Sequence, residues 1–230
     1  MTTQISSLDL AGHMDVLGST PQSCRDAVLS QCSKLKFQRN ETLWAQGEVG
    51  GFVAFMLNGK AMSSYHSPGG KAGITGFWRD GDILGAADLG GFENRQMTLK
   101  FLETSTVYTL SVTSFYSLLE QFPELARQIV QALSVRLRWV AHLALTLATH
   151  STEDRVRGVL LALSASFGVK VEQGLSIDLK LTHEDLASMV GVSRQFVNGA
   201  LNRIKNDGHI KIGNRKIIII DLQGLQNADY

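Results

Sequence analysis

The stretch LTHEDLASMVGVSRQFVNGALNRIK, residues 181–205, determines the fold that we predict for the C-terminal part of the chain. The hydroxyl of Thr182 and, three residues later, the carboxylate of Asp185 can satisfy the free backbone amides of a helix start. Gly191 permits the tight bend that a short first helix needs before a second one, and Ser193 can cap that second helix. The stretch therefore predicts a helix-turn-helix.

The second predicted helix has two faces with different chemistry. Val197, Leu201 and Ile204 recur at helical spacing and should face the core. The opposite side of its first two turns carries polar side chains whose donors and acceptors suit the edges of DNA bases, namely Arg194, Gln195 and Asn198. The pattern is that of a helix that enters the major groove of duplex DNA.

Residues 210–220 form two β-rich runs that Gly213 and Asn214 interrupt, and Gly208 precedes them as a candidate helix C-cap. This pattern predicts a hairpin wing. Basic residues outnumber acidic residues over residues 180–216, and neutralisation of DNA phosphates requires such a local surplus. The sequence therefore favours a winged helix-turn-helix that binds DNA. Two alternatives stay open: a capped helix pair with a purely structural role, and a helix-turn-helix that contacts another protein.

Length and composition indicate a soluble globular protein. The 230 residues allow one large domain or two ordinary ones. With 44% hydrophobic and 19% charged residues and a formal net charge of +1, the chain is not a polycation, so DNA affinity must come from a local basic patch, doubled in a dimer. Because no basic segment with an apolar core begins the chain, and no apolar run approaches the ~20 residues of a membrane span, we expect a cytoplasmic protein.

The two cysteines, Cys24 and Cys32, lie in no Cys-x-x-Cys or Cys/His cluster typical of zinc or iron-sulfur sites. We expect two reduced thiols without a special role, with a redox sensor as the alternative. The sequence also shows no Ser/His/Asp, paired-carboxylate or Gly-x-x-x-x-Gly-Lys pattern with supporting context. We therefore expect a protein that is not an enzyme and holds no metal.

Residues 35–111 consist of short apolar or alternating runs with glycine at most of the corners, which predicts an antiparallel β-sandwich or roll. The runs are 36–39, 41–44, 51–57, 61–66, 72–78, 97–102 and 106–111. Short helices are expected at residues 26–32 and from Thr113 or Ser114 to Gln121.

Pro123 is well placed at the start of a long helix that runs to about His150. One face of this helix repeats apolar residues at spacings of four and three, the seam of a coiled coil: Leu133, Leu137, Val140, Ala144 and Leu147. The seam can pack on the β-rich region or on the same helix of a second copy. We favour the homodimer, because a helix of about 27 residues is ~40 Å long and a small β-domain covers only part of that length.

These elements divide the chain into three parts. Residues 1–122 form a β-rich domain whose first 22 residues are expected to be a loosely held arm. Residues 123–150 form the dimerisation helix. Residues 151–230, which begin with a helix capped at Ser151, form the DNA-binding domain.

This order of elements, at this length, resembles the superfamily of the cyclic-AMP receptor protein and the oxygen regulator FNR, and the resemblance covers nearly the whole chain. The resemblance rests on residues 181–187 and 190–197, together with Gly47-Glu48, Gly59 and the run GDILG at 81–85. It implies an α+β fold: an N-terminal antiparallel β-roll of the cyclic-nucleotide-binding type, cupin- or jelly-roll-like, a long central dimerisation helix and a C-terminal winged helix-turn-helix. It also implies a homodimeric bacterial transcription regulator in which an effector on the β-roll reorients the DNA-binding domains, with double-stranded DNA and RNA polymerase as partners and no membrane.

The effector site that the resemblance implies is altered in this chain. Relatives that bind cyclic AMP carry a Gly-Glu pair for the ribose and an Arg-Ser pair for the phosphate. Here Ala86 follows Gly85, and Gln96 and Met97 stand in place of the Arg-Ser pair. A register shifted by one would place Arg95 there but would not restore the carboxylate. Burial of a phosphate without a cationic partner is strongly unfavourable, so we do not expect standard cyclic-AMP binding.

The same region offers a candidate effector pocket, whose residues are Phe77, Trp78, Gly85, Ala86, Gln96, Met97, Leu99 and Trp139. In one interpretation the apolar members fill the core of the roll, and in the other they form an apolar effector pocket. Since the superfamily includes haem-based gas sensors, His66 and His142 are conceivable axial ligands of haem. An iron-sulfur cluster of the FNR type is excluded, because two cysteines cannot supply four thiolates. No cofactor is therefore predicted, and haem stays an alternative.

Family precedent places base contacts at Arg194, Gln195 and Gly199. Arg194 can hold guanine O6 and N7 in a bidentate pair, worth ~1–3 kcal/mol of discrimination. Gln195 should prefer adenine or tolerate several bases, Gly199 has no side chain to read with, and Asn198 can reach a base or a phosphate. The operator should be two-fold symmetric and differ from the half-site of the cyclic-AMP receptor protein. The DNA-binding candidates are Thr182, His183, Ser193, Arg194, Gln195, Asn198, Gly199, Arg203, Lys211, Arg215 and Lys216.

Overall fold

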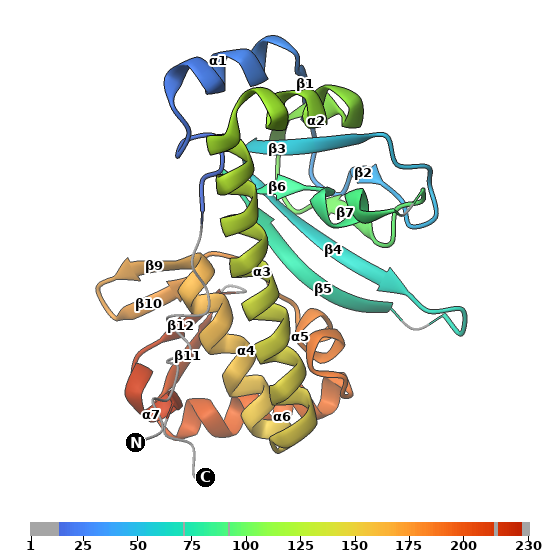
Figure 1. Ribbon diagram of the computed structural model, residues 1–230. Helices are drawn as coiled ribbons and strands as arrows, with labels where there is room; N and C mark the ends of the chain where they lie inside the picture. Colours follow the sequence, from blue (N-terminus) through green and yellow to red (C-terminus); the bar gives the residue numbers. More distant parts are fainter. Residues whose placement is uncertain (1–13, 71, 92, 214–215, 227–230) are drawn as a thin grey trace. The chain divides into compact units, whose positions relative to one another are not determined.

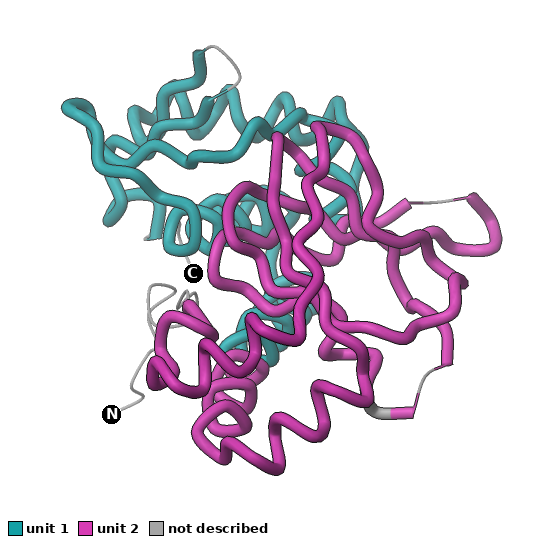
Figure 2. Tube along the Cα trace, turned by 90° about the horizontal axis from the view of Figure 1, so that it is seen from above, with its two compact units in different colours: residues 1–12, 135–230 teal, residues 13–134 magenta. Residues whose placement is uncertain are grey.

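The computed structural model describes residues 14–70, 72–91, 93–213 and 216–226. The chain divides into two compact units, residues 13–134 and residues 135–230 together with 1–12 (Figure 2). The predicted N-terminal arm lies mostly outside the described residues. The division falls within the long helix α3 (Pro123–Thr149), so both units contain part of that helix.

The first unit is a β-roll made of two four-stranded antiparallel sheets (Figure 1). One sheet has the order β1-β8-β3-β6, with β1 (Ser33–Phe37), β8 (Ser105–Ser111), β3 (Phe52–Asn58) and β6 (Ile83–Leu84). The other has the order β2-β7-β4-β5, with β2 (Thr42–Trp44), β7 (Thr98–Phe101), β4 (Lys60–His66) and β5 (Ala72–Arg79). Helices α1 (Gln22–Ser30) and α2 (Val112–Gln121) flank the strands, and a short 3-10 helix, η1 (Ala86–Gly90), follows β6.

Strand β3 is apolar throughout its centre because both of its faces are covered. Val53 and Phe55 pack in a cluster with side chains of α1, α2 and the start of α3. Ala54 and Met56, which point to the opposite face, pack in a second cluster with side chains of the other sheet. Because successive side chains of a strand alternate between faces, a strand buried on both faces must be a continuous apolar run rather than an alternating one.

The second unit contains the C-terminal part of α3 and a small α/β domain. Helix α4 (Thr152–Phe167) packs against α5 (His183–Val190), α6 (Arg194–Asn206) and α7 (Leu222–Gln226). An antiparallel sheet of order β11-β12-β10-β9 completes the domain, with β9 (Gly168–Val171), β10 (Gly174–Ile177), β11 (Ile210–Gly213) and β12 (Lys216–Ile219).

Helix α3 exposes most of the apolar seam that the sequence predicts, and Leu147 at its end is only partly exposed. Leu133, Leu137 and Val140 are exposed large apolar side chains, and Leu137 is 69% exposed. Val130, also exposed, extends the repeat by one position toward the start of the helix. In the part of the chain that the structure describes, no helix combines the length and the apolar character needed to cross a membrane.

Most elements lie where the sequence predicts them, and the differences have local causes. Helix α1 begins at Gln22, immediately after Pro21, rather than at Asp26. Helix α2 is capped by Ser111, whose Oγ accepts a hydrogen bond from the backbone N of Ser114 at 3.0 Å, rather than by Thr113 or Ser114. The two-residue strand β6, which is too short for a period-two pattern, and the β9–β10 hairpin were not predicted from the sequence.

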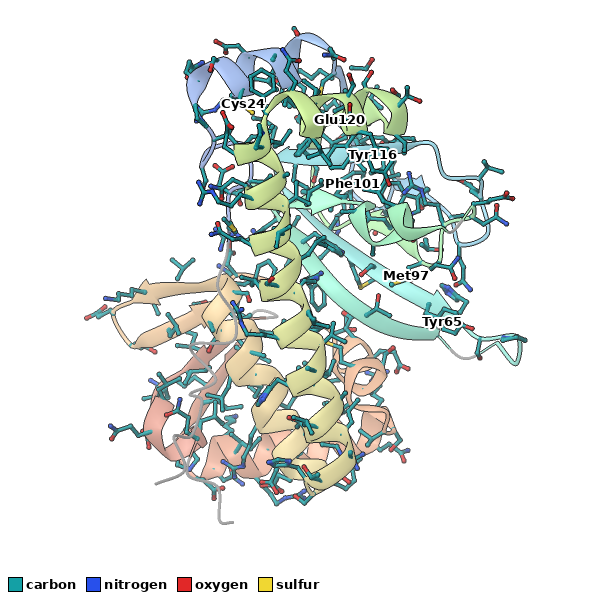
Figure 3. The ribbon with its side chains drawn as sticks, in the orientation of Figure 1. Cys24, Tyr65, Met97, Phe101, Tyr116 and Glu120 are labelled. Atoms are coloured by element: carbon teal, nitrogen blue, oxygen red, sulfur yellow. The ribbon has the colours of Figure 1, made fainter. Side chains whose placement is uncertain are left out.

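The two cysteines lie in or beside the core of the first unit. Cys24, on α1 (Figure 3), is fully buried, and Cys32 packs against the same cluster. Burial raises the pKa of both thiols, that of Cys32 to about 11. Since the thiolate is the reactive form of cysteine, these surroundings favour the interpretation of two unreactive thiols over a redox sensor.

Candidate nucleic-acid interface

The turn between α5 and α6 is built by local hydrogen bonds. Thr182 Oγ1 accepts a hydrogen bond from the backbone N of Asp185 at 3.0 Å, and Thr182 N donates to Asp185 Oδ2 at 2.8 Å. This capping box was predicted from the sequence. Gly191 then ends α5 with φ 70°, a left-handed conformation that glycine adopts without steric cost.

Helix α6 is held by its apolar face. Ser193 caps it by accepting a hydrogen bond from the backbone N of Phe196 at 3.2 Å. The buried side of the helix consists of Val197, Ala200, Leu201 and Ile204. Arg194, Gln195 and Asn198 are exposed on the opposite side, as predicted.

Five of the predicted DNA-binding residues surround one open depression of about 640 Å³: His183, Ser193, Arg194, Gln195 and Asn198. Among the described residues, the side chains of Arg194, Gln195 and Asn198 have no hydrogen-bond or ion-pair partner. Their donors and acceptors are therefore free for a partner outside the chain. Thr182 caps the helix that begins at His183, and Gly199 follows one residue after Asn198 on α6.

The predicted wing is the hairpin of β11 and β12, in which Ile210 pairs with Ile219 and Gly213 with Lys216. Lys211 and Lys216 are exposed, and Lys211 Nζ donates to Gln173 Oε1 at 3.1 Å. Arg215 lies outside the described residues. The wing therefore presents at least one basic side chain, that of Lys216, beside the helix-turn-helix.

A charged network holds the C-terminal half of α6 against the start of α4. Arg203 Nε donates to Glu153, and Arg157 donates to Glu153 at 3.1 Å and to Asp207 at 3.4 Å. Burial raises the pKa of Glu153, but hydrogen bonds and charges from the two arginines outweigh burial and lower its pKa below the ordinary value. Arg203 was predicted to bind DNA; its pairing with Glu153 directs its charge within the chain, so DNA contact by Arg203 stays a prediction.

In the β-roll, the altered effector region contains a buried arginine whose two Nη atoms are paired within the chain, while its Nε has no hydrogen-bond partner among the described residues. The side chain of Arg95 is 2% exposed, and its Nη1 lies 3.1 Å from Asp88 Oδ2. Its Nη2 donates to the backbone O of Phe52, and its guanidinium lies over the Trp44 ring at 3.9 Å from the ring centroid. A Cβ on Gly85, where φ is 81°, would come within 2.6 Å of Arg95 Nη1. Glycine at this position therefore leaves the space that the guanidinium fills.

The other predicted effector residues do not gather around one cavity among the described residues. Ala86 packs in the cluster beneath the helices, whereas Leu99 and Trp78 pack in the cluster between the sheets. Phe77 is buried and Gln96 is exposed. The sulfur of Met97 (Figure 3) accepts a hydrogen bond from Thr75 Oγ1 at 2.8 Å. These positions favour the interpretation in which the apolar members fill the core, and the effector pocket stays a prediction.

The residues considered for haem lie in different units. His66 is exposed at the end of β4, where its backbone N donates to Gln46 Oε1 at 2.7 Å. His142 and Trp139 line a narrow gap between α3 and α4 in the second unit. Burial, with a smaller effect of the charge on His150, lowers the pKa of His142. Within the described residues, no three His, Cys, Asp or Glu side chains gather in a way that could hold a metal ion.

Two families of known domains match the chain. Residues 34–122 match the cyclic nucleotide-binding domain, and residues 154–228 match the Crp-like helix-turn-helix domain. The first range covers the strands of the β-roll and α2, and the second covers nearly all of α4 and the winged helix-turn-helix.

Similar proteins cover most of the chain. The CRP-like cAMP-activated global transcriptional regulator of Mycobacterium tuberculosis is 27% identical over 201 residues, which is 86% of this chain and 89% of that protein. The global nitrogen regulator of a Nostoc species is 26% identical over 185 residues, 80% of this chain and 83% of that protein.

Solved structures share the fold at lower identity. A mutant of CooA from Carboxydothermus hydrogenoformans has a TM-score of 0.77 at 22% identity, with 96% of this chain and 97% of that chain covered. The c-di-GMP responsive global regulator CLP of Xanthomonas campestris has a TM-score of 0.73 at 19% identity, with 86% and 99% covered.

A cyclic-nucleotide-binding type of β-roll followed by a long helix and a winged helix-turn-helix defines a class of transcription regulators that bind DNA through their C-terminal domain. The chain belongs to that class. Within it, the two domain matches and the regulators that resemble the chain along most of its length place it in the CRP/FNR superfamily.

Proposed function

We propose that this protein regulates transcription as a homodimer that binds a two-fold symmetric DNA site and acts on RNA polymerase. The observation that carries the proposal is the group of exposed polar side chains at the start of α6. Arg194, Gln195 and Asn198 have no partner among the described residues and surround one depression with His183 and Ser193. Unpaired donors and acceptors at the start of a recognition helix match the base edges of the major groove.

The α3 seam supports the dimer. Its exposed members Leu133, Leu137 and Val140 follow the spacing of a coiled coil, and large apolar side chains in such a row are stable when a second identical row covers them. A dimer also doubles the basic surface, which matters because the net charge of the chain is only +1. The two copies of α6 then read the two halves of a symmetric site.

The β-roll does not fit a cyclic nucleotide bound in the usual way. The ribose carboxylate is replaced by Ala86, and Arg95, which a register shifted by one would place at the phosphate, is paired with Asp88 and with the backbone O of Phe52. A phosphate entering there would have to displace the chain's own carboxylate from a buried arginine. We therefore propose that the β-roll responds to a different small effector or to none.

A binding-site selection with the full chain and random duplex DNA tests the proposal. We expect a symmetric consensus, affinity that falls steeply with salt, and a half-site that differs from that of the cyclic-AMP receptor protein. Recovery of that relative's half-site unchanged would contradict the readout, and a dimer without sequence-selective binding would favour a role in protein contact.

Sedimentation of the wild type and of Leu137→Glu tests the dimer. A charge at a seam position that is 69% exposed in the single chain should leave the fold intact and prevent dimerisation. Glu120→Gln, a change on α2 away from the seam, serves as the control that should stay dimeric. A wild-type protein that is monomeric at micromolar concentration would contradict the role assigned to α3.

A further inference from the structure

The exposed face of α6 continues past the residues considered so far. Gln195, Asn198 and Asn202 are separated by three and four positions, so they lie on one face of the helix. All three are exposed, and among the described residues their side-chain amides have no hydrogen-bond partner. A row of three unpaired amides therefore points away from the domain. Asn202 was not among the residues predicted from the sequence, because those candidates came from the first two turns of the helix and Asn202 lies in the third.

Gly199 lies within this row and is not required by the packing of the domain. A Cβ built on Gly199 would meet, within 4 Å, only Nη1 of the Arg203 side chain, at 3.5 Å, which is ordinary van der Waals contact. Gly85 differs, since a Cβ there would clash with Arg95. Glycine in a helix interior is less favourable than alanine. The contacts within the chain therefore give no reason for glycine at position 199, whereas close approach of another molecule to the helix backbone would.

The length of the amide side chains leads to the same conclusion. Asparagine is shorter than the arginine or glutamine at the start of α6, so Asn198 and Asn202 reach base edges only if the helix lies deep in the groove. A missing side chain between them permits that depth. An amide placed in this way can accept from adenine N6 and donate to N7. The seven steps from Gln195 to Asn202 span ~10 Å of helix, which corresponds to about three base pairs.

We propose that Asn202 is a specificity-determining residue that reads an A·T pair, and that Gly199 is the position at which the α6 backbone comes close to the groove floor. The amide row then reads A·T pairs across the half-site beyond the guanine that Arg194 contacts. The inference rests on the proposed function, since it assumes that α6 enters the major groove.

Binding-site selection in parallel with the wild type, Asn202→Ala and Asn206→Ala tests the role of Asn202. Asn206 is a matched control, because it is an exposed amide on the same face in the last turn of α6, ~6 Å beyond Asn202 and therefore outside the base pairs that the helix from Gln195 to Asn202 spans. We expect Asn202→Ala to lose the preference for A·T at one position in each half-site and ~10-fold in affinity for the wild-type consensus. Asn206→Ala should select the wild-type consensus.

The outcomes separate this inference from the proposed function. A wild type without any consensus would overturn both. A wild type with a symmetric consensus that Asn202→Ala selects unchanged would overturn the inference alone, as would a consensus without an A·T pair at any position that Asn202→Ala alters.

Gly199→Ala and Gly199→Leu test the close approach of the α6 backbone to DNA. Two quantities are measured for each variant: its stability to urea and its affinity for the consensus site. Both substitutions replace glycine by a better helix former, and the Cβ that they share makes only a van der Waals contact with Arg203, so Gly199→Ala should make the domain more resistant to urea and Gly199→Leu should stay folded. Affinity for the consensus should nevertheless fall, more for leucine than for alanine. Unchanged affinity of the stably folded Gly199→Leu variant would overturn the close approach.

Discussion

Arg95 of the β-roll and Arg194 of α6 carry the same side chain in opposite surroundings. Arg95 is buried, paired with Asp88 and stacked over Trp44. Arg194 is exposed at the start of a helix and has no partner among the described residues. The difference shows two uses of one side chain. An arginine stabilises the fold where the chain supplies its counter-charge, and it can bind a ligand where the chain leaves it unpaired. The surroundings of Arg95 therefore disfavour binding of an anionic ligand, whereas those of Arg194 favour it.

The largest effect should come from Arg95→Ala. The substitution leaves the carboxylate of Asp88, whose side chain is 13% exposed, without its buried partner. Removal of one member of a buried pair costs ~3–5 kcal/mol, so the free energy of unfolding, measured by urea denaturation, should fall by about that amount. The double variant Arg95→Ala with Asp88→Asn should be less destabilised than Arg95→Ala alone. A loss below ~1 kcal/mol, as found for exposed pairs, would mean that the pair does not support the roll.

Arg194→Ala should have the opposite profile. Stability should stay within ~0.5 kcal/mol of the wild type, as for surface substitutions generally. Affinity for the selected site, followed by fluorescence anisotropy, should fall by a factor that corresponds to ~1–3 kcal/mol, with a smaller loss on random DNA. Equal losses on both DNAs would show that Arg194 contacts phosphate rather than a base.

A smaller effect is expected at the wing. Lys216 is exposed on β12 and, if it lies against a phosphate, Lys216→Ala should lower affinity on every sequence alike. The slope of log affinity against log salt should become less steep by ~1 per protomer, and the selected consensus should not change. A changed consensus would instead give the wing a part in base recognition.

The smallest effect should be that of cyclic AMP. Because Asp88 already occupies Arg95, millimolar cyclic AMP should leave both the melting temperature and the DNA affinity of the wild type unchanged. A ligand that binds the native state at 100 times its Kd stabilises it by ~2.7 kcal/mol. A clear rise in melting temperature would therefore show that the nucleotide displaces Asp88 or binds elsewhere.

Local patterns made the helix-turn-helix predictable, whereas the charged contacts were beyond the reach of the sequence. The capping box of Thr182 and Asp185 joins residues three apart, so its geometry follows from spacing. The ion pair between Arg203 and Glu153 joins residues 50 apart in the chain. From formal charge alone, Arg203 was expected to be available to DNA. Its pairing with Glu153 becomes visible only in the folded chain.

The same reasoning explains what could be predicted of the β-roll. Its strands have clear apolar runs and were found, but the role of Arg95 depends on Trp44, Phe52 and Asp88, which come from three separate segments. A shifted register could suggest that Arg95 lies near the expected phosphate position. The sequence could not show that the carboxylate of Asp88 lies beside Arg95.

Strand β3 determines where the β-roll can change under mutation. Val53 to Met56 have no solvent face, so a larger or polar side chain at any of them disturbs one of the two clusters. Strand β4 alternates between buried and partly exposed positions from Ala61 to Ser64 and therefore has sites that tolerate replacement. Variants selected for response to a new effector should accumulate changes on β4 and its neighbours while β3 stays almost unaltered.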